Sequence, residues 1–276
     1  MTLPPFDLHR ASSIEEAREL LTRHGEDAAV ICGGTELLLL LKLGFAAYGH
    51  LVDIKGIEEL RGVRSDNGAL VIGATATHRE IERSPDVLEK LPALAAMEQR
   101  VANLRVRNVG TLGGNLCFSD PHSDPATFLL AVGAEVEVDG ARQPLAEFLV
   151  GPYETALEHG QLLHSVRIPL PPAGTRIAHK KLAFHERPAA TVACAVRVDG
   201  GTIAEARIAV GSVGPRAVLV DDALAGATVD DGDALRTAAE RAAEAAGAVE
   251  DANGSVEYKE QLVRVLVERS VREALT

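Results

Sequence analysis

Two consecutive glycines follow a short apolar stretch near the start of the chain, and this pattern restricts the possible folds most. Residues 28–31 predict a buried strand, and Gly33-Gly34 come directly after it. Thr35 can cap a following helix, which we expect over residues 36–43. A strand, a glycine turn and a helix predict an α/β unit. Such a turn can bring helix-start N–H groups to a diphosphate, but a tight turn without a ligand has the same pattern.

A second glycine-containing loop, Thr111-Leu112-Gly113-Gly114-Asn115, lies about eighty residues later. We expect it to offer consecutive N–H groups within an irregular segment, residues 108–125. Asp124 directly precedes Pro125 and is therefore expected to cap a helix. Asp120, His122 and Asp124 alternate along the chain as metal ligands could. However, a hard cation needs more oxygen ligands and a transition metal needs more His or Cys, so we expect no metal there.

The remaining chain predicts a mixture of helices and strands. A Pro-rich stretch, residues 169–174, cannot be a helix or a central strand and marks a boundary. Beyond it, the alternation over residues 192–198 and the turn at Gly200-Gly201 predict a β-hairpin. Further helices are expected after Ser13 and Thr77, from Pro85, and over residues 234–246 and 256–275; further strands are expected over residues 51–54, 70–74 and 134–138.

Composition excludes several classes of function. The net charge of −12 repels nucleic acid and anionic lipid, and the 3% aromatic content without Trp argues against a base-stacking surface. Cys32, Cys117 and Cys194 form no CxxC pair, so we expect no disulfide framework, zinc site or iron–sulfur site. The longest apolar run, residues 37–41, is too short to cross a membrane. With no cleavable signal recognised, we expect a cytoplasmic protein.

An ordered series of motifs covers almost the whole chain. It comprises Gly33–Leu37, Gly73–Thr77 (GATAT), Arg107–Leu116 (RNVGTLGGNL), Leu162–Pro169 (LLHSVRIP), Lys180–Phe184 and the closing segment Ser255–Leu275 with Tyr258. This series resembles the FAD-binding medium subunit of molybdenum hydroxylases, the family that includes carbon monoxide dehydrogenase and xanthine dehydrogenase. An ordered set of this kind is far more specific than either glycine loop alone.

The resemblance implies an α+β fold of the PCMH or vanillyl-alcohol-oxidase type. Two FAD-binding subdomains, an α/β unit at residues 1–55 and an α+β unit at residues 56–172, would precede a small domain of antiparallel sheet and helices at residues 173–276. Asp124 would contact a flavin-side hydroxyl, Leu163 would pack on the isoalloxazine, and Lys181 would bond its pyrimidine edge. The full implied FAD-binding set is Ile31, Cys32, Gly33, Gly34, Thr35, Glu36, Leu37, Leu38, Thr75, Thr77, Val101, Thr111, Leu112, Gly113, Gly114, Asn115, Asp124, Leu163 and Lys181.

Some positions depart from the family pattern. Cys32 stands where Ala is frequent, Glu36 where Asp is frequent, and His185 where Arg is frequent. The last departure puts the electrostatic tuning of the flavin edge in question. Val101 replaces an aromatic residue found in some relatives, and no cysteine-rich insertion for a further iron–sulfur cluster is present.

The implied function is electron transfer. A large molybdopterin subunit would oxidise the substrate, and [2Fe-2S] clusters of a small subunit would pass the electrons to FAD on this chain and then to an external acceptor. The expected assembly is a heterotrimer, doubled to (αβγ)2. Neither the substrate nor the final acceptor follows from the sequence. Two alternatives stay open: a free-standing flavoprotein oxidase or dehydrogenase with His164, His179 or His185 as base, and a scaffold protein that has lost FAD.

Overall fold

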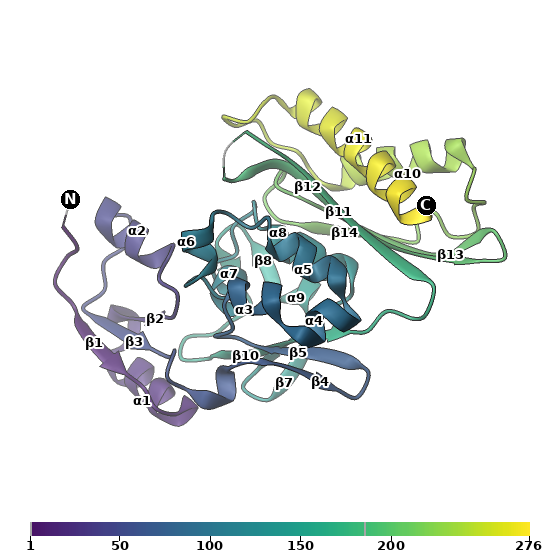
Figure 1. Cartoon of the computed structure of the whole chain (residues 1–276). Helices are drawn as coiled ribbons and strands as arrows, with labels where there is room; N and C mark the ends of the chain where they lie inside the picture. Colours follow the sequence, from purple (N-terminus) through teal and green to yellow (C-terminus); the bar gives the residue numbers. More distant parts are fainter. Residues whose placement is uncertain (1, 185) are drawn as a thin grey trace.

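The structure, a computed structural model, describes residues 2–184 and 186–276. Three sheets of three to five strands follow one another along the chain, with helices packed beside them (Figure 1). This mixed helix and sheet architecture confirms the predicted α+β class. Within the described ranges, no helix has both the length and the apolar character needed to cross a membrane.

The first sheet is parallel and has the strand order β1-β3-β2. Ser13 caps α1 as predicted, since its side chain accepts a hydrogen bond from the Glu16 N–H. The expected Thr35 cap is wrong: α2 begins at Leu37, Glu36 occupies the cap position, and no side chain caps this helix. The elements here are β1 (Asp7–Arg10), α1 (Ile14–His24), the 3-10 helix η1 (Gly25–Asp27), β2 (Ala28–Ile31), α2 (Leu37–Leu43), β3 (His50–Asp53) and η2 (Glu58–Leu60).

The second sheet is antiparallel, with the order β4-β5-β10-β6-β7. Thr77 forms the predicted capping box with Glu80 at the start of α3. The strands are β4 (Val63–Asp66), β5 (Ala69–Gly73), β6 (Glu135–Val138), β7 (Ala141–Pro144) and β10 (Leu163–Pro169), with a separate hairpin of β8 (Leu149–Gly151) and β9 (Glu154–Thr155). The helices are α3 (His78–Arg83), α4 (Pro85–Lys90), α5 (Pro92–Glu98), α6 (Leu104–Arg107), α7 (Leu112–Phe118), α8 (Asp124–Ala131) and α9 (Leu145–Phe148).

The segment from residue 108 to residue 125 corrects two predictions. It was expected to be irregular, yet it contains α7, whose first turn is the second glycine loop itself. A helix tolerates two glycines here because Gly113 packs on Ala74, the residue after β5: a Cβ on it would lie 2.6 Å from the Ala74 carbonyl oxygen. The cap of α8 is Ser123 rather than Asp124, since the Ser123 Oγ accepts from the Ala126 N–H at 3.0 Å. The Asp124 carboxylate is therefore available for other contacts.

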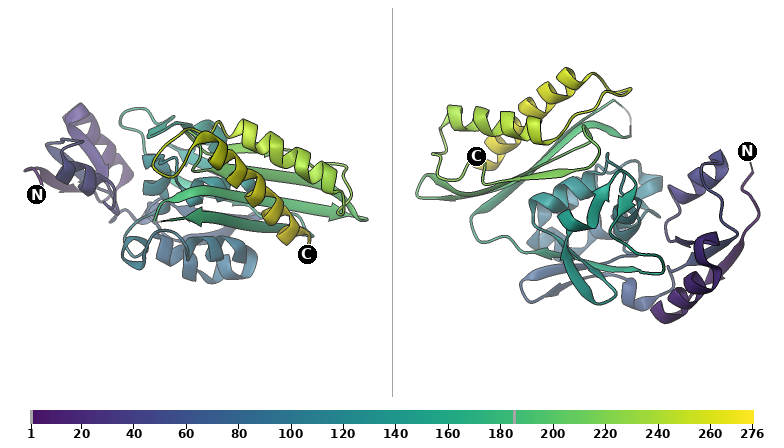
Figure 2. Two further views of the ribbon diagram at one scale, coloured as in Figure 1. Left: turned by 90° about the horizontal axis from the view of Figure 1, so that it is seen from above. Right: turned by 180° about the vertical axis from the view of Figure 1, so that it is seen from behind.

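The third sheet has the order β11-β12-β13-β14 and includes the predicted hairpin as β12 and β13. Both faces of β12 are buried along most of its length, and alternation separates them: Val192 and Cys194 face α10 and α11, whereas Ala193 belongs to the core that α8 joins. Figure 2 shows α10 and α11 crossing one face of this sheet. The elements are β11 (Thr175–Ala183), β12 (Pro188–Asp199), β13 (Thr202–Gly211), β14 (Val218–Asp221), α10 (Gly232–Ala245) and α11 (Val256–Leu275).

Candidate functional site

A cavity of about 490 Å³ lies where residues from all three sheet units meet. The loop after β2 forms one wall, and the start of α7 together with Asp124 forms another. Leu163 at the start of β10 and Pro188 at the start of β12 complete it. A site assembled in this way exists only when the three units are folded against one another.

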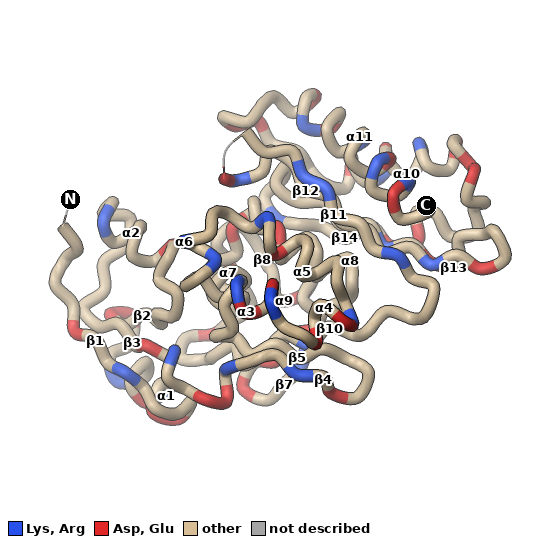
Figure 3. Tube along the Cα trace, viewed as in Figure 1, with Lys and Arg blue, Asp and Glu red and all other residues tan. Residues whose placement is uncertain are grey.

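The first glycine loop presents unused backbone donors to this cavity. Gly34 has a φ of +69°, which only glycine adopts without strain. Among the described residues, the N–H groups of residues 34–37 donate to no backbone oxygen, and the helix they open has no side-chain cap. Figure 3 shows Lys and Arg scattered over the described chain rather than gathered on one element. The first loop would therefore hold an anion in this cavity through its backbone amides.

The second glycine loop behaves differently, and the expectation that it offers free N–H groups is wrong. The Leu112 and Gly113 amides donate to the Ala76 and Ala74 carbonyl oxygens, both at 3.0 Å. The Gly114 amide donates to the Thr111 Oγ1 at 3.1 Å. At Gly114, which has no side chain, a ligand in the cavity can therefore approach the backbone of this loop closely. The neighbouring Asn115 also lines the cavity.

The two loops are packed directly on each other. A Cβ on Gly33 would lie 2.3 Å from the Val109 carbonyl oxygen and 2.8 Å from the Gly110 Cα. Contact between the two backbones therefore already requires a glycine at position 33, before any ligand is considered. Cys32 lies at the same junction, where burial raises the pKa of its thiol.

Asp124 is one of the residues that line the cavity, and its carboxylate is paired with a lysine. Its Oδ2 lies 2.5 Å from the Lys181 Nζ, which also donates to the Arg100 carbonyl oxygen at 2.7 Å. Its Oδ1 is buried without a hydrogen-bond partner among the described residues. A buried acceptor without a donor is costly, so this oxygen is an energetic cost that the Lys181 ion pair offsets.

His179 packs against the same carboxylate. Its Nε2 lies 2.9 Å from the Thr191 Oγ1 and 3.7 Å from the Asp124 Oδ1. Burial lowers the pKa of His179 to about 4, although the Asp124 charge opposes this change. The ring is therefore neutral at pH 7.

An ion-paired arginine that the sequence analysis missed joins the cavity walls. The Arg187 Nη2 lies 3.0 Å from the Asp120 Oδ2 and 3.4 Å from the Glu36 Oε2, and all three residues line the cavity. Burial raises the pKa of Glu36, and the Arg187 charge opposes that rise. Burial would also raise the pKa of Asp120, but hydrogen bonds from His122 and the Arg187 charge leave it lowered. The sequence does hold one indication of this residue. His185 stands where Arg is frequent in the family, and Arg187 follows two positions later.

The cavity brings together most, but not all, of the implied FAD-binding residues. Those that line it are Ile31, Cys32, Gly33, Gly34, Thr35, Glu36, Leu37, Val101, Thr111, Gly113, Gly114, Asn115, Asp124 and Leu163. Thr75 and Thr77 instead line a neighbouring cavity of about 270 Å³, which Cys32, Gly33 and Thr111 share. Leu38, Leu112 and Lys181 line neither of these two cavities. His185 lies outside the described residues.

Three further observations concern expectations drawn from the sequence. His164 and His179, offered as bases for a free-standing enzyme, do not line the main cavity. Asp120 and His122 are in contact, whereas Asp124 pairs with Lys181, so the structure does not form the alternating metal set. Aromatic residues also line the cavity, namely Tyr48, Phe118 and Tyr153, which sequence reasoning missed because aromatic residues are scarce.

The fold and the cavity fit an FAD-binding protein, because the unused amides of the first loop offer donors to a diphosphate. Comparison with known families agrees. A family described as the FAD binding domain in molybdopterin dehydrogenase matches residues 4–171, and the CO dehydrogenase flavoprotein C-terminal domain matches residues 178–274.

Individual relatives match along almost the whole chain. The carbon monoxide dehydrogenase medium chain of Hydrogenophaga pseudoflava is 34% identical over 283 residues, covering 99% of this chain and 98% of its own. Carbon monoxide dehydrogenase from the same organism superposes with a TM-score of 0.95 at 35% identity, over 99% of this chain and 98% of that chain. Quinoline 2-oxidoreductase from Pseudomonas putida 86 gives 0.93 at 30% identity, over 100% and 98%. The chain therefore belongs to the FAD-binding medium subunits of molybdenum hydroxylases, which are components of multi-subunit oxidoreductases.

Proposed function

We propose that this chain transfers electrons from the [2Fe-2S] clusters of a small partner subunit to an external acceptor, while a large molybdopterin subunit oxidises the substrate. FAD, when bound, supplies the capacity to exchange electrons singly or in pairs. The proposal rests on one observation. The cavity is lined both by the helix start at residues 34–37, whose amides have no backbone acceptor among the described residues, and by Gly114, where a cofactor can approach the backbone closely.

Each wall has a distinct task in this proposal. The amides of residues 34–37 hold the diphosphate, and Gly114 with Asn115 lets the cofactor approach the start of α7 closely. Asp124 contacts a cofactor hydroxyl, and Leu163 packs on the flavin ring. Lys181 acts through Asp124, whose charge it neutralises at 2.5 Å. The implied site residues that do not line the main cavity, Leu38, Thr75, Thr77 and Leu112, support the loops that do.

We also propose the division into residues 1–55, 56–172 and 173–276, supported by the separate sheet that each part contains. The proposed assembly is a heterotrimer with large and small subunits, doubled to (αβγ)2. Copurification of a [2Fe-2S] subunit and a molybdenum-containing subunit with this chain tests the assembly. Substrate-dependent bleaching of the flavin by the chain alone would instead favour a free-standing oxidase.

The cofactor site is tested by Gly114→Glu, with Gly232→Glu as the matched control. A Cβ on Gly114 would lie 2.9 Å from the Thr111 Oγ1, a side-chain atom that must shift to admit it, and Gly114 lines the cavity, so we expect the new carboxylate to enter the cavity. Gly232 opens α10, where a Cβ meets only Arg236 at 3.8 Å, and it does not line the cavity. Gly34→Glu is less suitable because the φ of +69° would strain any side chain.

We expect the unmodified chain and Gly232→Glu to bind FAD and to absorb at about 450 nm, a general flavin property. The clash and the charge repulsion in Gly114→Glu should weaken FAD affinity by at least about 100-fold at low salt. Near-normal affinity in Gly114→Glu, measured by fluorescence titration, would contradict the loop assignment. An unmodified chain that takes up no added FAD would overturn the proposed function itself.

A further inference from the structure

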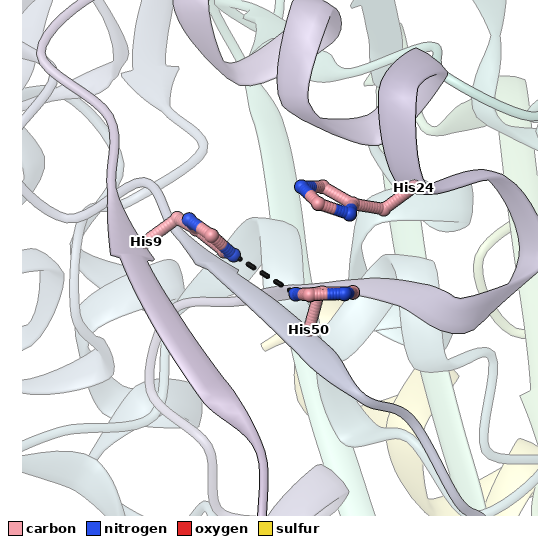
Figure 4. A group of neighbouring side chains, drawn as sticks. All are labelled: His9, His24 and His50. Atoms are coloured by element: carbon pink, nitrogen blue, oxygen red, sulfur yellow. Dashed lines mark hydrogen bonds between the residues drawn. The ribbon is translucent and has the colours of Figure 1, made fainter.

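Three histidines from separate elements of the first sheet unit lie side by side. His9 is on β1, His24 is the last residue of α1, and His50 opens β3. Figure 4 shows His24 turned toward the other two rings, which are joined by a hydrogen bond of 3.1 Å between the His9 Nε2 and the His50 Nδ1. One ligand nitrogen from each ring lies within 4.8 Å of the others, the sole such group of three or more His, Cys, Asp or Glu found in residues 2–184 and 186–276.

The backbone fixes the elements that carry these rings. Gly49, the residue before His50, donates its N–H to the Asp27 Oδ1 at 2.7 Å, in the turn that follows α1. Its carbonyl oxygen accepts from the Asp7 N–H at 2.8 Å, two residues before His9. Parallel pairing of Asp7 with His50 sets the register of the two strands. The three rings are therefore brought together by strand pairing and by a turn contact, before any ligand is considered.

The chemistry of the group favours a transition metal. Imidazole nitrogen suits zinc, copper and nickel, whereas magnesium and calcium require oxygen ligands. Zinc–nitrogen bonds of about 2.0–2.1 Å in tetrahedral geometry place ligand nitrogens about 3.3 Å apart, close to the 3.1 Å between His9 and His50. Small side-chain rotations of His24 complete the set, because all three rings are only partly buried.

We propose that His9, His24 and His50 form a binding site for one divalent transition-metal ion of the zinc type. Water or the Asp7 carboxylate takes the fourth position; the Asp7 Oδ2 lies 3.8 Å from the His50 Nδ1, and its side chain is 78% exposed. None of the three histidines lines the main cavity, so the ion has no direct contact with the proposed flavin site. It joins β1, α1 and β3, and thereby stabilises the unit whose β2 leads into the first glycine loop.

The test uses the full chain with FAD bound and Zn²⁺ as the probe. Equilibrium dialysis with elemental analysis compares the unmodified chain with His9→Gln, His24→Gln and His50→Gln. His159→Gln is the matched control, because His159 is an exposed histidine outside the cluster, with its ring 3.3 Å from the Leu21 carbonyl oxygen. FAD content and metal-free melting temperature, measured on the same samples, report whether each variant is folded.

We expect one Zn²⁺ per chain in the unmodified protein and in His159→Gln. Each cluster variant should bind it at least about 100-fold more weakly, because loss of a mere supporting group already costs 10- to 100-fold. Zn²⁺ should also raise the melting temperature of the unmodified chain, but not that of the cluster variants. No bound zinc, or equal zinc in all four variants, would overturn the proposal and leave the FAD assignment untouched.

Discussion

The buried ring of His179 should make the stability of the folded chain depend on pH. Burial lowers its pKa to about 4, against an ordinary value of 6.5. Between these values the unfolded chain binds a proton that the folded chain does not, so the stability present above pH 6.5 is lost as the pH falls toward 4. At pH 5 the two pKa values give a loss of about 2 kcal/mol in the free energy of unfolding from this residue alone.

The perturbation is His179→Gln, which keeps a hydrogen-bonding group near the Thr191 hydroxyl but cannot titrate. Urea unfolding of both proteins at pH 7 and pH 5, with FAD present throughout, gives the difference between their stabilities at each pH. On going from pH 7 to pH 5, the free energy of unfolding of His179→Gln should rise by about 2 kcal/mol relative to that of the unmodified chain. His159→Gln, which removes an exposed histidine, should follow the unmodified chain. A His179→Gln difference that stays constant from pH 7 to pH 5 would refute the argument from burial.

Three further predictions concern residues in the walls of the cavity or directly behind them. Lys181→Met should lower the free energy of unfolding by about 3–5 kcal/mol, because the buried Asp124 carboxylate loses its partner. The double variant with Asp124→Asn should lose less than the sum of the two single variants. Additive losses in urea unfolding would argue against the ion pair. Gly113→Ala should destabilise the chain by about 1–3 kcal/mol, since its Cβ would lie 2.6 Å from the Ala74 carbonyl oxygen, and an unchanged urea midpoint would contradict that contact. Burial raises the pKa of Cys117 to about 12, so it should react with maleimide at pH 8 about 1,000-fold more slowly than an ordinary cysteine; fast labelling followed by peptide mapping would show that the thiol is accessible.

Local patterns predicted much of the secondary structure. The apolar stretch and glycine turn at residues 28–34 appear as β2 and its loop, and the alternation over residues 192–198 appears as β12. Hydrophobic period and capping chemistry act over a few residues, so they can be read directly from the chain. The same reasoning failed at residues 112–118, where two glycines argued against a helix that packing on Ala74 stabilises.

The sequence by itself determined the fold class and the family, because an ordered set of motifs can be recognised without knowing which residues are in contact. Tertiary structure alone decided which donors and charges face the cavity. It left the amides of residues 34–37 unused and engaged those of the second loop. It also paired Asp124 with Lys181 and joined Arg187 to Glu36, residues that lie 57 and 151 positions apart. Such pairs depend on how distant strands and helices pack, and that information is not contained in any short stretch of the chain.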